Sequence, residues 1–281
     1  MRNPGRKYLG TTAELLLAAI LLFIVLFPVL WLLLISFRSV AEVYRFPLTL
    51  LPERVDLSAY REVWLSKGFS NDWLQYFVNT TLVSSIVSAV VMLWGTLMGY
   101  SLSRLRGRLL QPVQLLLIIV QLFNGPALVI PMYLLLNSIG LYNSLFGYGL
   151  LLVLFFLPFS TLLSLSFAKS IPFELDEAAK LDGCSQFQSF RKVFLPLARI
   201  GMTTTGLMTF LLVWSEYPFA VALLEGRNRT VSTALVDLVS GLNVYWNQMA
   251  AASVIISIPV LIVLLFTQRY IVQGLTAGSG K

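Results

Sequence analysis

The chain has 281 residues, of which 57% are hydrophobic and 12% are charged. Because an average soluble domain is roughly 25% charged, this composition excludes an ordinary soluble protein and indicates a chain that lies in lipid. No histidine occurs and Cys184 is the only cysteine. A Ser-His-Asp triad, a disulfide within the chain and a zinc site built from His or paired Cys are therefore excluded.

Six apolar segments of membrane-spanning length follow one another along the chain. Four runs without any Asp, Glu, Lys or Arg each exceed the roughly 18 residues that indicate a spanning helix. The longest run must fold back on itself, and the polar, glycine-bearing stretch 137–144 is its natural turn. A further apolar run, interrupted only by Glu216, is also long enough. The predicted spans are 15–35, 77–102, 109–136, 145–168, 200–224 and 247–268.

An even number of spans places both termini on the same side of the membrane. Thirteen of the twenty Lys and Arg residues lie on that side, and five of the other seven lie in the long loop 36–76. Basic residues favour the cytoplasm and long loops weigh less in this rule, so we expect both termini in the cytoplasm. The net charge of +7 is then a topology signal, which argues against nucleic-acid binding.

No short repeat, low-complexity tract or flexible linker interrupts the sequence. This favours a single transmembrane domain over residues 1–281, with a core of about 77–268 and a C-terminal tail at 269–281. Gly95 and Gly99 predict close helix packing in the second span. Prolines within or beside the spans predict breaks of the kind transporters use, or kinks of purely structural origin, at Pro126, Pro131, Pro158, Pro218 and Pro259.

The inner loop 169–199 predicts two short amphipathic helices. We expect the first to have Ser170 as its cap and Pro172 in its first turn, and to stop at Gly183. Ser185 and Gln188 form a capping-box pattern at the start of the second. Such a pair could lie on lipid headgroups, but the acidic residues of the first helix disfavour an anionic leaflet. A docking element for a cytoplasmic partner is the favoured interpretation.

The spacing of residues in this loop resembles the EAA loop of binding-protein-dependent ABC permeases. That pattern is EAA, three residues, G, nine residues, I, one residue, LP, and Val193 stands here where the pattern has Ile. Nearly the whole chain is similar to the carbohydrate-uptake branch, which is related to the second membrane subunit of the maltose transporter. The similar motifs are Ser36-Phe-Arg, Tyr60-Arg-Glu, Asn79, Ile130-Pro131-Met-Tyr, Gly140-Leu-Tyr-Asn143, Leu157-Pro158-Phe, Trp214-Ser-Glu-Tyr and the end of the chain from Gln268 to Gly278.

The resemblance implies an all-α polytopic protein of the bacterial inner membrane, with the type I ABC importer permease fold. Its implied partners are a second homologous permease subunit, two ATPase subunits and an extracytoplasmic solute-binding protein. ATP and Mg²⁺ would be bound by the ATPase subunits and no cofactor by this chain. The C-terminal Gly278-Ser-Gly-Lys281 agrees, because it lacks the first glycine, the following Ser or Thr and the preceding strand of a phosphate-binding loop. The tail is implied to contact an ATPase subunit, and a frayed terminus is the alternative.

The same resemblance implies roles for residues of the inner loop. In the family, the Glu that matches Glu177 pairs with a basic residue in a cleft of the ATPase subunit. Gly183 would permit the bend between the two helices, and Pro196 would end the second one. The implied coupling residues are Glu177, Ala178, Ala179, Asp182, Gly183, Leu195 and Pro196.

Polar and aromatic residues of the spans are candidates for contact with a polar solute. Glu216 lies within the fifth predicted span, where an ionisable group is costly and suggests a pathway or a buried pair. It could bond sugar hydroxyls, hold a neighbouring helix or sit protonated. Hydrogen bonds and stacking could also come from Asn79, Asn124, Tyr133, Trp214 and Tyr217, with helix packing or interface anchoring as the alternative for each.

Two other classes of protein remain as alternatives to an ATP-driven importer subunit. A secondary transporter driven by an ion gradient would be expected to carry several intramembrane ionisable groups, and only Glu216 is present in the spans. An intramembrane enzyme is less favoured, because few residues are available for acid/base chemistry. The sequence does not identify the solute.

Overall fold

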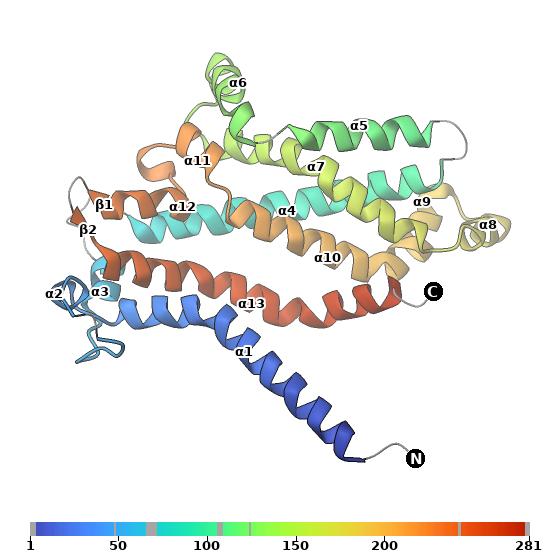
Figure 1. Ribbon diagram of the computed structural model, residues 1–281. Coiled ribbons are helices and arrows are strands. Elements are labelled where there is room, and N and C mark those ends of the chain that lie inside the picture. The colour runs from blue at the N-terminus through green and yellow to red at the C-terminus, as the bar shows by residue number, and fades with distance from the viewer. Residues whose placement is uncertain are drawn as a thin grey trace. The chain divides into compact units, whose positions relative to one another are not determined.

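The computed structural model describes residues 4–47, 49–65, 72–105, 109–123, 125–240 and 243–278. These residues are almost wholly helical, with one short antiparallel hairpin (Figure 1). Their contacts divide the chain into two compact units, Met1–Asn71 with Leu235–Ile258, and Asp72–Ala234 with Pro259–Lys281. Each unit is described by itself.

The first unit contains the N-terminal helix and the long loop that follows it. Its helices are α1 (Pro4–Ser36), α2 (Val40–Val43) and α3 (Ser58–Leu65). Its later part contains the 3-10 turn η3 (Leu235–Leu238), strands β1 (Val239–Ser240) and β2 (Asn243–Val244), and the beginning of α13 (Trp246–Gly278). Val239 pairs with Val244 in the hairpin. The hydroxyl of Tyr44 donates a hydrogen bond of 2.5 Å to the carbonyl of Val244, so the hairpin is tied to the long loop that follows α1.

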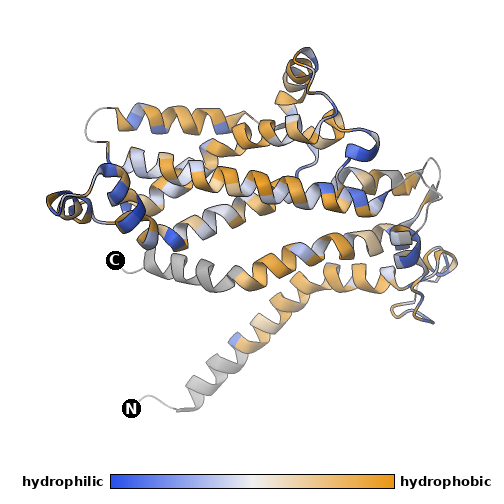
Figure 2. Ribbon diagram, turned by 180° about the vertical axis from the view of Figure 1, so that it is seen from behind, coloured by the Kyte–Doolittle hydropathy of each residue, from blue (hydrophilic) through white to orange (hydrophobic). Residues whose placement is uncertain are grey.

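Three long helices form the centre of the second unit: α4 (Trp73–Ser103), α7 (Leu145–Lys169) and α10 (Leu195–Trp214). They lie side by side in both ribbon views (Figure 1, Figure 2). A Cβ added to Gly95 would lie 2.1 Å from the Oγ of Ser160, and one added to Gly99 would lie 2.7 Å from the backbone N of Leu165. The two glycines therefore let α4 approach α7 closely, which confirms the prediction of packing.

The predicted third span consists of two helices, α5 (Leu110–Leu122) and α6 (Gly125–Ser138). Their axes are bent by 88°. Among the described residues, five other helices are long and apolar enough to cross a membrane, so the count reaches the predicted six when the bent pair forms one span. Pro126, at the second position of α6, has no N–H and suits the first turn of a helix that starts anew.

Hydropathy along the helices agrees with a lipid environment. Figure 2 shows hydrophobic residues along the long helices and hydrophilic residues gathered mostly near helix ends. The span Glu14–Ser36 of α1 has a mean hydropathy of 3.1 in its most apolar window, and none of that window is buried. Apolar side chains that face outward over such a length require an apolar solvent.

The fifth span begins and ends earlier than predicted. One continuous helix runs through α9 (Gln186–Ser189), the π-helical turn η1 (Phe190–Phe194) and α10, and it stops at Trp214. A separate short helix, α11 (Pro218–Leu223), follows, so the expected range 200–224 is wrong at both ends. The break occurs because Pro218 disfavours helical geometry at the preceding residue, and Tyr217 has φ −126° and ψ −48°.

The resemblance implied that Pro196 ends the second inner-loop helix, and this is wrong. Pro196 lies in the first turn of α10, within the continuous helix. The π-helical turn that precedes it changes the hydrogen-bond register at the point where a proline would otherwise clash with the preceding turn of an α-helix. The remaining short elements of the second unit are η2 (Gly226–Asn228) and α12 (Val231–Ala234).

Candidate functional site

The inner loop folds as a helix pair at one end of the α4–α7–α10 bundle. The first helix, α8 (Glu174–Leu181), is shorter than predicted. Ser170 is the C-cap of α7, where its hydroxyl donates to the carbonyl of Phe167 at 2.7 Å, so its expected role as the cap of α8 is wrong. Gly183 has φ +84°, a left-handed conformation that favours glycine, and it ends α8 as predicted.

The start of α9 also follows the sequence closely. The Ser185 side chain accepts a hydrogen bond from the backbone N–H of Gln188, and the Gln188 side chain accepts one from the backbone N–H of Ser185. Both bonds satisfy backbone donors that a helix start would leave without partners. The turn between α8 and α9 is therefore fixed by local chemistry, and the capping box predicted there is confirmed.

One face of α8 is buried and the other is exposed. Asp176 and Ala179, three residues apart, point inward. Glu177, Ala178, Asp182 and Gly183 are exposed, and of the two remaining residues of the EAA pattern Leu195 is partly buried and Pro196 is exposed. Two large apolar side chains also face outward, with Leu181 89% and Phe187 67% exposed. The helix pair thus combines an inward anchor with an outward surface that is both acidic and apolar.

The inward face of α8 is held by a buried ion pair. The Nε of Arg104, just after the end of α4, lies 2.5 Å from Oδ2 of Asp176, and Nη1 donates to the carbonyl of Ile171 at 3.3 Å. The hydroxyl of Ser189 donates to the other carboxylate oxygen of Asp176 at 2.5 Å. We call Arg104, Asp176 and Ser189 the anchor cluster. Sequence analysis missed it, because its members come from three separate segments.

Aromatic rings surround the guanidinium of the anchor cluster. Its central carbon lies 5.4 Å from the ring centre of Tyr100, 5.6 Å from that of Phe173 and 5.9 Å from that of Phe194. These distances are within the range of cation–π attraction. Tyr100 also packs against Phe194, with ring centres 4.5 Å apart. The charge of Arg104 is therefore balanced by one carboxylate in a mostly apolar setting.

Glu216 lies in the break between α10 and α11 and caps the second of these helices. One carboxylate oxygen accepts a hydrogen bond from the backbone N–H of Phe219 at 2.7 Å. The other accepts from the N–H of Ala220 at 3.1 Å and from the hydroxyl of Tyr148 in α7 at 2.6 Å. The residue is 9% exposed. Of the roles considered for Glu216, the contacts match the holding of a neighbouring helix.

Asn79 is 1% exposed and clamps the loop after α11. Its side-chain N–H₂ donates to the backbone carbonyls of Arg227 and Arg229 at 2.8 and 2.9 Å. Its oxygen accepts from the side chain of Gln75 at 2.8 Å. Both polar atoms of the Asn79 side chain are therefore used in hydrogen bonds within the chain. The pathway role suggested for Asn79 stays a prediction, and the structure gives this side chain a structural use.

The aromatic pathway candidates lie in different settings. Trp214 is buried between the rings of Phe77 and Phe210, with centres 5.7 and 5.6 Å away. Tyr133 and Tyr217 are exposed. Asn124 lies outside the described residues.

The turn 139–144 is bonded to the loop after α11. The Tyr142 hydroxyl donates to the carboxylate of Glu225 at 2.7 Å. Asn143, which has φ +51°, accepts from the backbone N–H of Glu225 at 2.9 Å through its side-chain oxygen. The hydrogen bond to Glu225 raises the pKa of the Tyr142 phenol to about 12, because ionisation would place two negative charges side by side.

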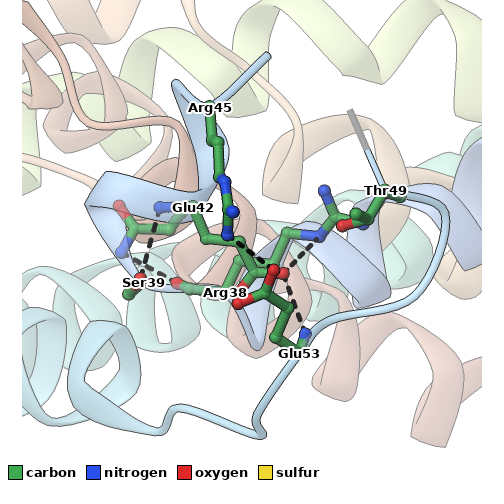
Figure 3. Close-up of polar contacts among 7 residues, drawn as sticks. Arg38, Ser39, Glu42, Arg45, Thr49 and Glu53 are labelled. Atoms are coloured by element: carbon green, nitrogen blue, oxygen red, sulfur yellow. Dashed lines mark hydrogen bonds and ion pairs between the residues drawn. The ribbon is translucent and has the colours of Figure 1, made fainter. Parts of the chain in front are cut away.

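The long loop that follows α1 in the first unit folds around a buried arginine (Figure 3). Arg38 is 1% exposed, its Nη2 donates to the carbonyl of Thr49 and its guanidinium lies 5.6 Å from the ring centre of Trp31. Glu42 accepts from the backbone N–H of Glu53 at 3.0 Å, and Arg45 forms an ion pair of 2.6 Å with Glu53. A cavity of about 410 Å³ lies beside these residues. Two motifs of the resemblance also meet here, since Ser36 and Tyr60 share a hydrogen bond of 2.7 Å.

An apolar cavity of about 350 Å³ lies in the second unit. Among the described residues, none of the polar or charged pathway candidates lines it. Its walls offer almost no group that could bond a hydroxylated solute, so it is not a candidate sugar site. The lining residues are Val120, Leu128, Met132, Leu135, Leu136, Ile139, Leu150, Leu151, Leu154, Phe155 and Phe219.

Apolar spans that form a helical bundle, with an anchored amphipathic helix pair at one end, define a multi-pass membrane component. Comparison with known proteins makes this class specific. Residues 91–277, more than half of the chain, match the family described as "Binding-protein-dependent transport system inner membrane component". The chain belongs to this family.

Individual relatives match nearly the full length of the chain. The inner membrane ABC transporter permease protein YcjP of Escherichia coli K12 is 32% identical, with 94% of each chain covered. The trehalose/maltose transport system permease protein MalG of Thermococcus litoralis is 32% identical, over 95% of this chain and 96% of that protein. A solved bacterial ABC transporter involved in import of the acidic polysaccharide alginate has a chain with a TM-score of 0.77 and 25% identity, over 96% of this chain and 99% of that chain. The resemblance to the carbohydrate-uptake branch and the predicted fold class are thereby confirmed.

Proposed function

We propose that this chain is a permease subunit of an ATP-driven importer for a carbohydrate or sugar-like solute. A second permease subunit would complete the pathway, a solute-binding protein would deliver the solute, and two ATPase subunits would bind ATP and Mg²⁺. The family is defined by dependence on a binding protein. One similar protein is named for trehalose and maltose transport, and another is described as involved in alginate import. Both support a carbohydrate as the solute class.

The observation that carries the proposal is the exposed, anchored helix pair α8–α9. A docking element must offer a surface to its partner and must also be held firmly to the spans, because a contact transmits force only if it is stiff. Glu177, Ala178 and Asp182 lie on the exposed side, and Ala179 packs on the inward side. Gly183 supplies the bend, and Leu195 and Pro196 continue directly into α10.

The proposed orientation places α8 and both termini in the cytoplasm. The excess of Lys and Arg on that side supports it. Glu216 supports an ATP-driven importer over an ion-driven transporter, because this intramembrane acid is engaged by two backbone N–H groups and a tyrosine. A carboxylate bonded in this way is poorly placed to bind and release a coupling ion.

The test is reconstitution of this chain with its permease partner, ATPase subunits and binding protein, with uptake of maltose, trehalose and an alginate oligosaccharide as probes. We expect the wild type to co-purify with the ATPase subunits and to import at least one probe at the expense of ATP. Glu177→Arg should lose the ATPase subunits or the stimulation of hydrolysis by the loaded binding protein. Glu174→Arg, the same charge change one turn earlier in α8, is the matched control and should retain both.

Uptake by the chain alone, driven by an ion gradient and independent of ATP, would replace the proposal with a secondary transporter. Equal loss in Glu174→Arg and Glu177→Arg would contradict a specific role for Glu177 and would leave only a requirement for acidic charge on α8.

A further inference from the structure

The anchor cluster of Arg104, Asp176 and Ser189 does not belong to the outward surface of the helix pair. Asp176 is 2% exposed, and both its carboxylate oxygens are engaged within the chain. It therefore cannot be read as part of a surface offered to a partner. What it does is join the end of α4, the start of α8 and the end of α9.

The burial of this ion pair makes the joint firm. Removing one member of a buried pair leaves an uncompensated charge, which is far more costly than the loss of an exposed pair. The geometry adds restraint, since Arg104 also bonds the carbonyl of Ile171 and Ser189 holds the second oxygen of Asp176. Rotation of α8 about its own axis would separate Asp176 from both Arg104 and Ser189.

The backbone alone connects α8 to the spans less firmly. On one side the segment 170–173, which contains Pro172, separates α8 from α7. On the other side Gly183 lies at the bend, and glycine has the least restricted backbone of any residue. The anchor cluster adds a side-chain link between α8 and the end of α4 to these two backbone connections.

A displacement of the end of α4 would be shared with α7. The close approach at Gly95 and Gly99 locks the two helices together, because even a Cβ would clash with α7 there. A tightly packed contact of this kind transmits shifts between its helices, since packed interiors are hard to deform. A continuous physical path therefore runs from α8 through Arg104 to the α4–α7 pair.

We propose that Arg104 and Asp176 act as positioning residues that transmit the movement of α8 to α4 and α7, so that ATP hydrolysis by partner subunits is coupled to opening of the pathway. This inference rests on the proposed function. It assigns the coupling step a route through the buried face of α8, in addition to the direct continuation of α9 into α10. Ser189 supports the route by orienting the Asp176 carboxylate.

The experiment is a double-mutant cycle in the reconstituted importer, with Arg104→Met, Asp176→Leu and the double variant. The readout is solute imported per ATP hydrolysed by assembled complexes, which a loss of folded protein alone would not change. Each single variant should lower this ratio about tenfold, within the usual range of coupling between sites. The double variant should lose no more than either single variant, because an apolar pair of similar volume can replace a buried ion pair.

Three further variants sharpen the test. Arg104→Lys keeps the charge but not the planar fork of donors, and should show a partial loss. Ser189→Ala should show a smaller loss than Asp176→Leu. Arg199→Met removes an exposed positive charge from α10 and should leave the ratio unchanged. Hydrogen exchange should rise across residues 174–189 in Asp176→Leu and stay unchanged in the centre of α7.

The outcomes separate this inference from the proposed function. If the wild type imports solute with ATP but the single variants keep its ratio, or if the losses multiply to about a hundredfold in the double variant, the inference is overturned and the proposed function stands. If the wild type neither recruits nor uses ATPase subunits, the proposed function fails and the inference fails with it.

Discussion

Replacement of Glu216 by alanine tests whether this residue serves the fold or the solute. The side chain accepts three hydrogen bonds, from the N–H groups of Phe219 and Ala220 and from the hydroxyl of Tyr148. Each buried donor left without an acceptor costs about 1 kcal/mol or more, so Glu216→Ala should destabilise this region by roughly 3–5 kcal/mol. The loss of the helix cap is included in that sum.

The assay is the melting temperature of the purified chain in detergent, together with the KM for uptake in the reconstituted importer. We expect Glu216→Ala to melt well below the wild type, with any complex that survives keeping an unchanged KM. Tyr148→Phe removes one of the three bonds and should show a loss of about 1 kcal/mol. Ser215→Ala is the matched control, because the exposed Ser215 hydroxyl bonds only carbonyls of its own helix and its removal should have little effect.

A wild-type melting temperature in Glu216→Ala, combined with a raised KM, would refute this reasoning. It would mean that the three bonds contribute little and that the carboxylate meets the solute in the working importer. The Glu216→Gln variant keeps one acceptor oxygen in its side-chain amide. Its stability should therefore fall between those of the wild type and Glu216→Ala.

Three other predictions follow from local contacts. Gly95→Leu should destabilise the chain by about 1–3 kcal/mol or prevent folding, because a Cβ would lie 2.1 Å from the Oγ of Ser160. Gly149→Ala, where the nearest atom is 3.7 Å from the added Cβ, should be tolerated, and melting temperatures check both. Asn79→Ala should speed hydrogen exchange in the loop after α11 without changing the KM for solute, and a raised KM with unchanged exchange would favour a pathway role. Tyr142 should ionise near pH 12, so its hydrogen bond should stabilise the fold fully below pH 10 and lose this effect as the pH rises to 12. The difference between ultraviolet titrations of the wild type and Tyr142→Phe measures the ionisation of this phenol, and a midpoint near pH 10 would contradict the prediction.

The spans and the inner-loop turn were predictable because their causes are local. A charge-free run longer than the bilayer is thick has few alternatives to a spanning helix. The capping box at Ser185 and the left-handed Gly183 depend on residues within a few positions of each other. Such features depend on short stretches of sequence and can be predicted from them.

The limits of the fifth span were predicted wrongly because hydropathy alone does not register backbone geometry. The predicted span began at Ile200, after a loop expected to end at Arg199, whereas one continuous helix runs from Gln186 to Trp214. At the other end, apolar residues on both sides of Glu216 suggested a continuous span, but Pro218 interrupts it. Pro218 was itself among the predicted break points, but hydropathy alone set the limits of the span.

Contacts between distant segments could not be predicted from one sequence. Arg104 and Asp176 are separated by two spans and a turn, and Arg38 meets Thr49 across an irregular loop. Nothing in either local pattern distinguishes a buried arginine from an exposed one. The sequence therefore predicted the inner-loop helix pair but not the contacts that hold it.

The buried polar residues show why candidate solute contacts are harder to predict than the inner-loop helices. A break in a membrane helix leaves backbone N–H and C=O groups that lipid cannot satisfy, so polar side chains are needed wherever the chain bends. Glu216 and Asn79 meet this need, and each is bonded to backbone groups of a loop or a short helix. Tyr133 and Tyr217 are exposed and offer aromatic faces that sugars commonly stack on. Mutation of these two tyrosines, ahead of the buried residues, is therefore the more direct search for solute contacts.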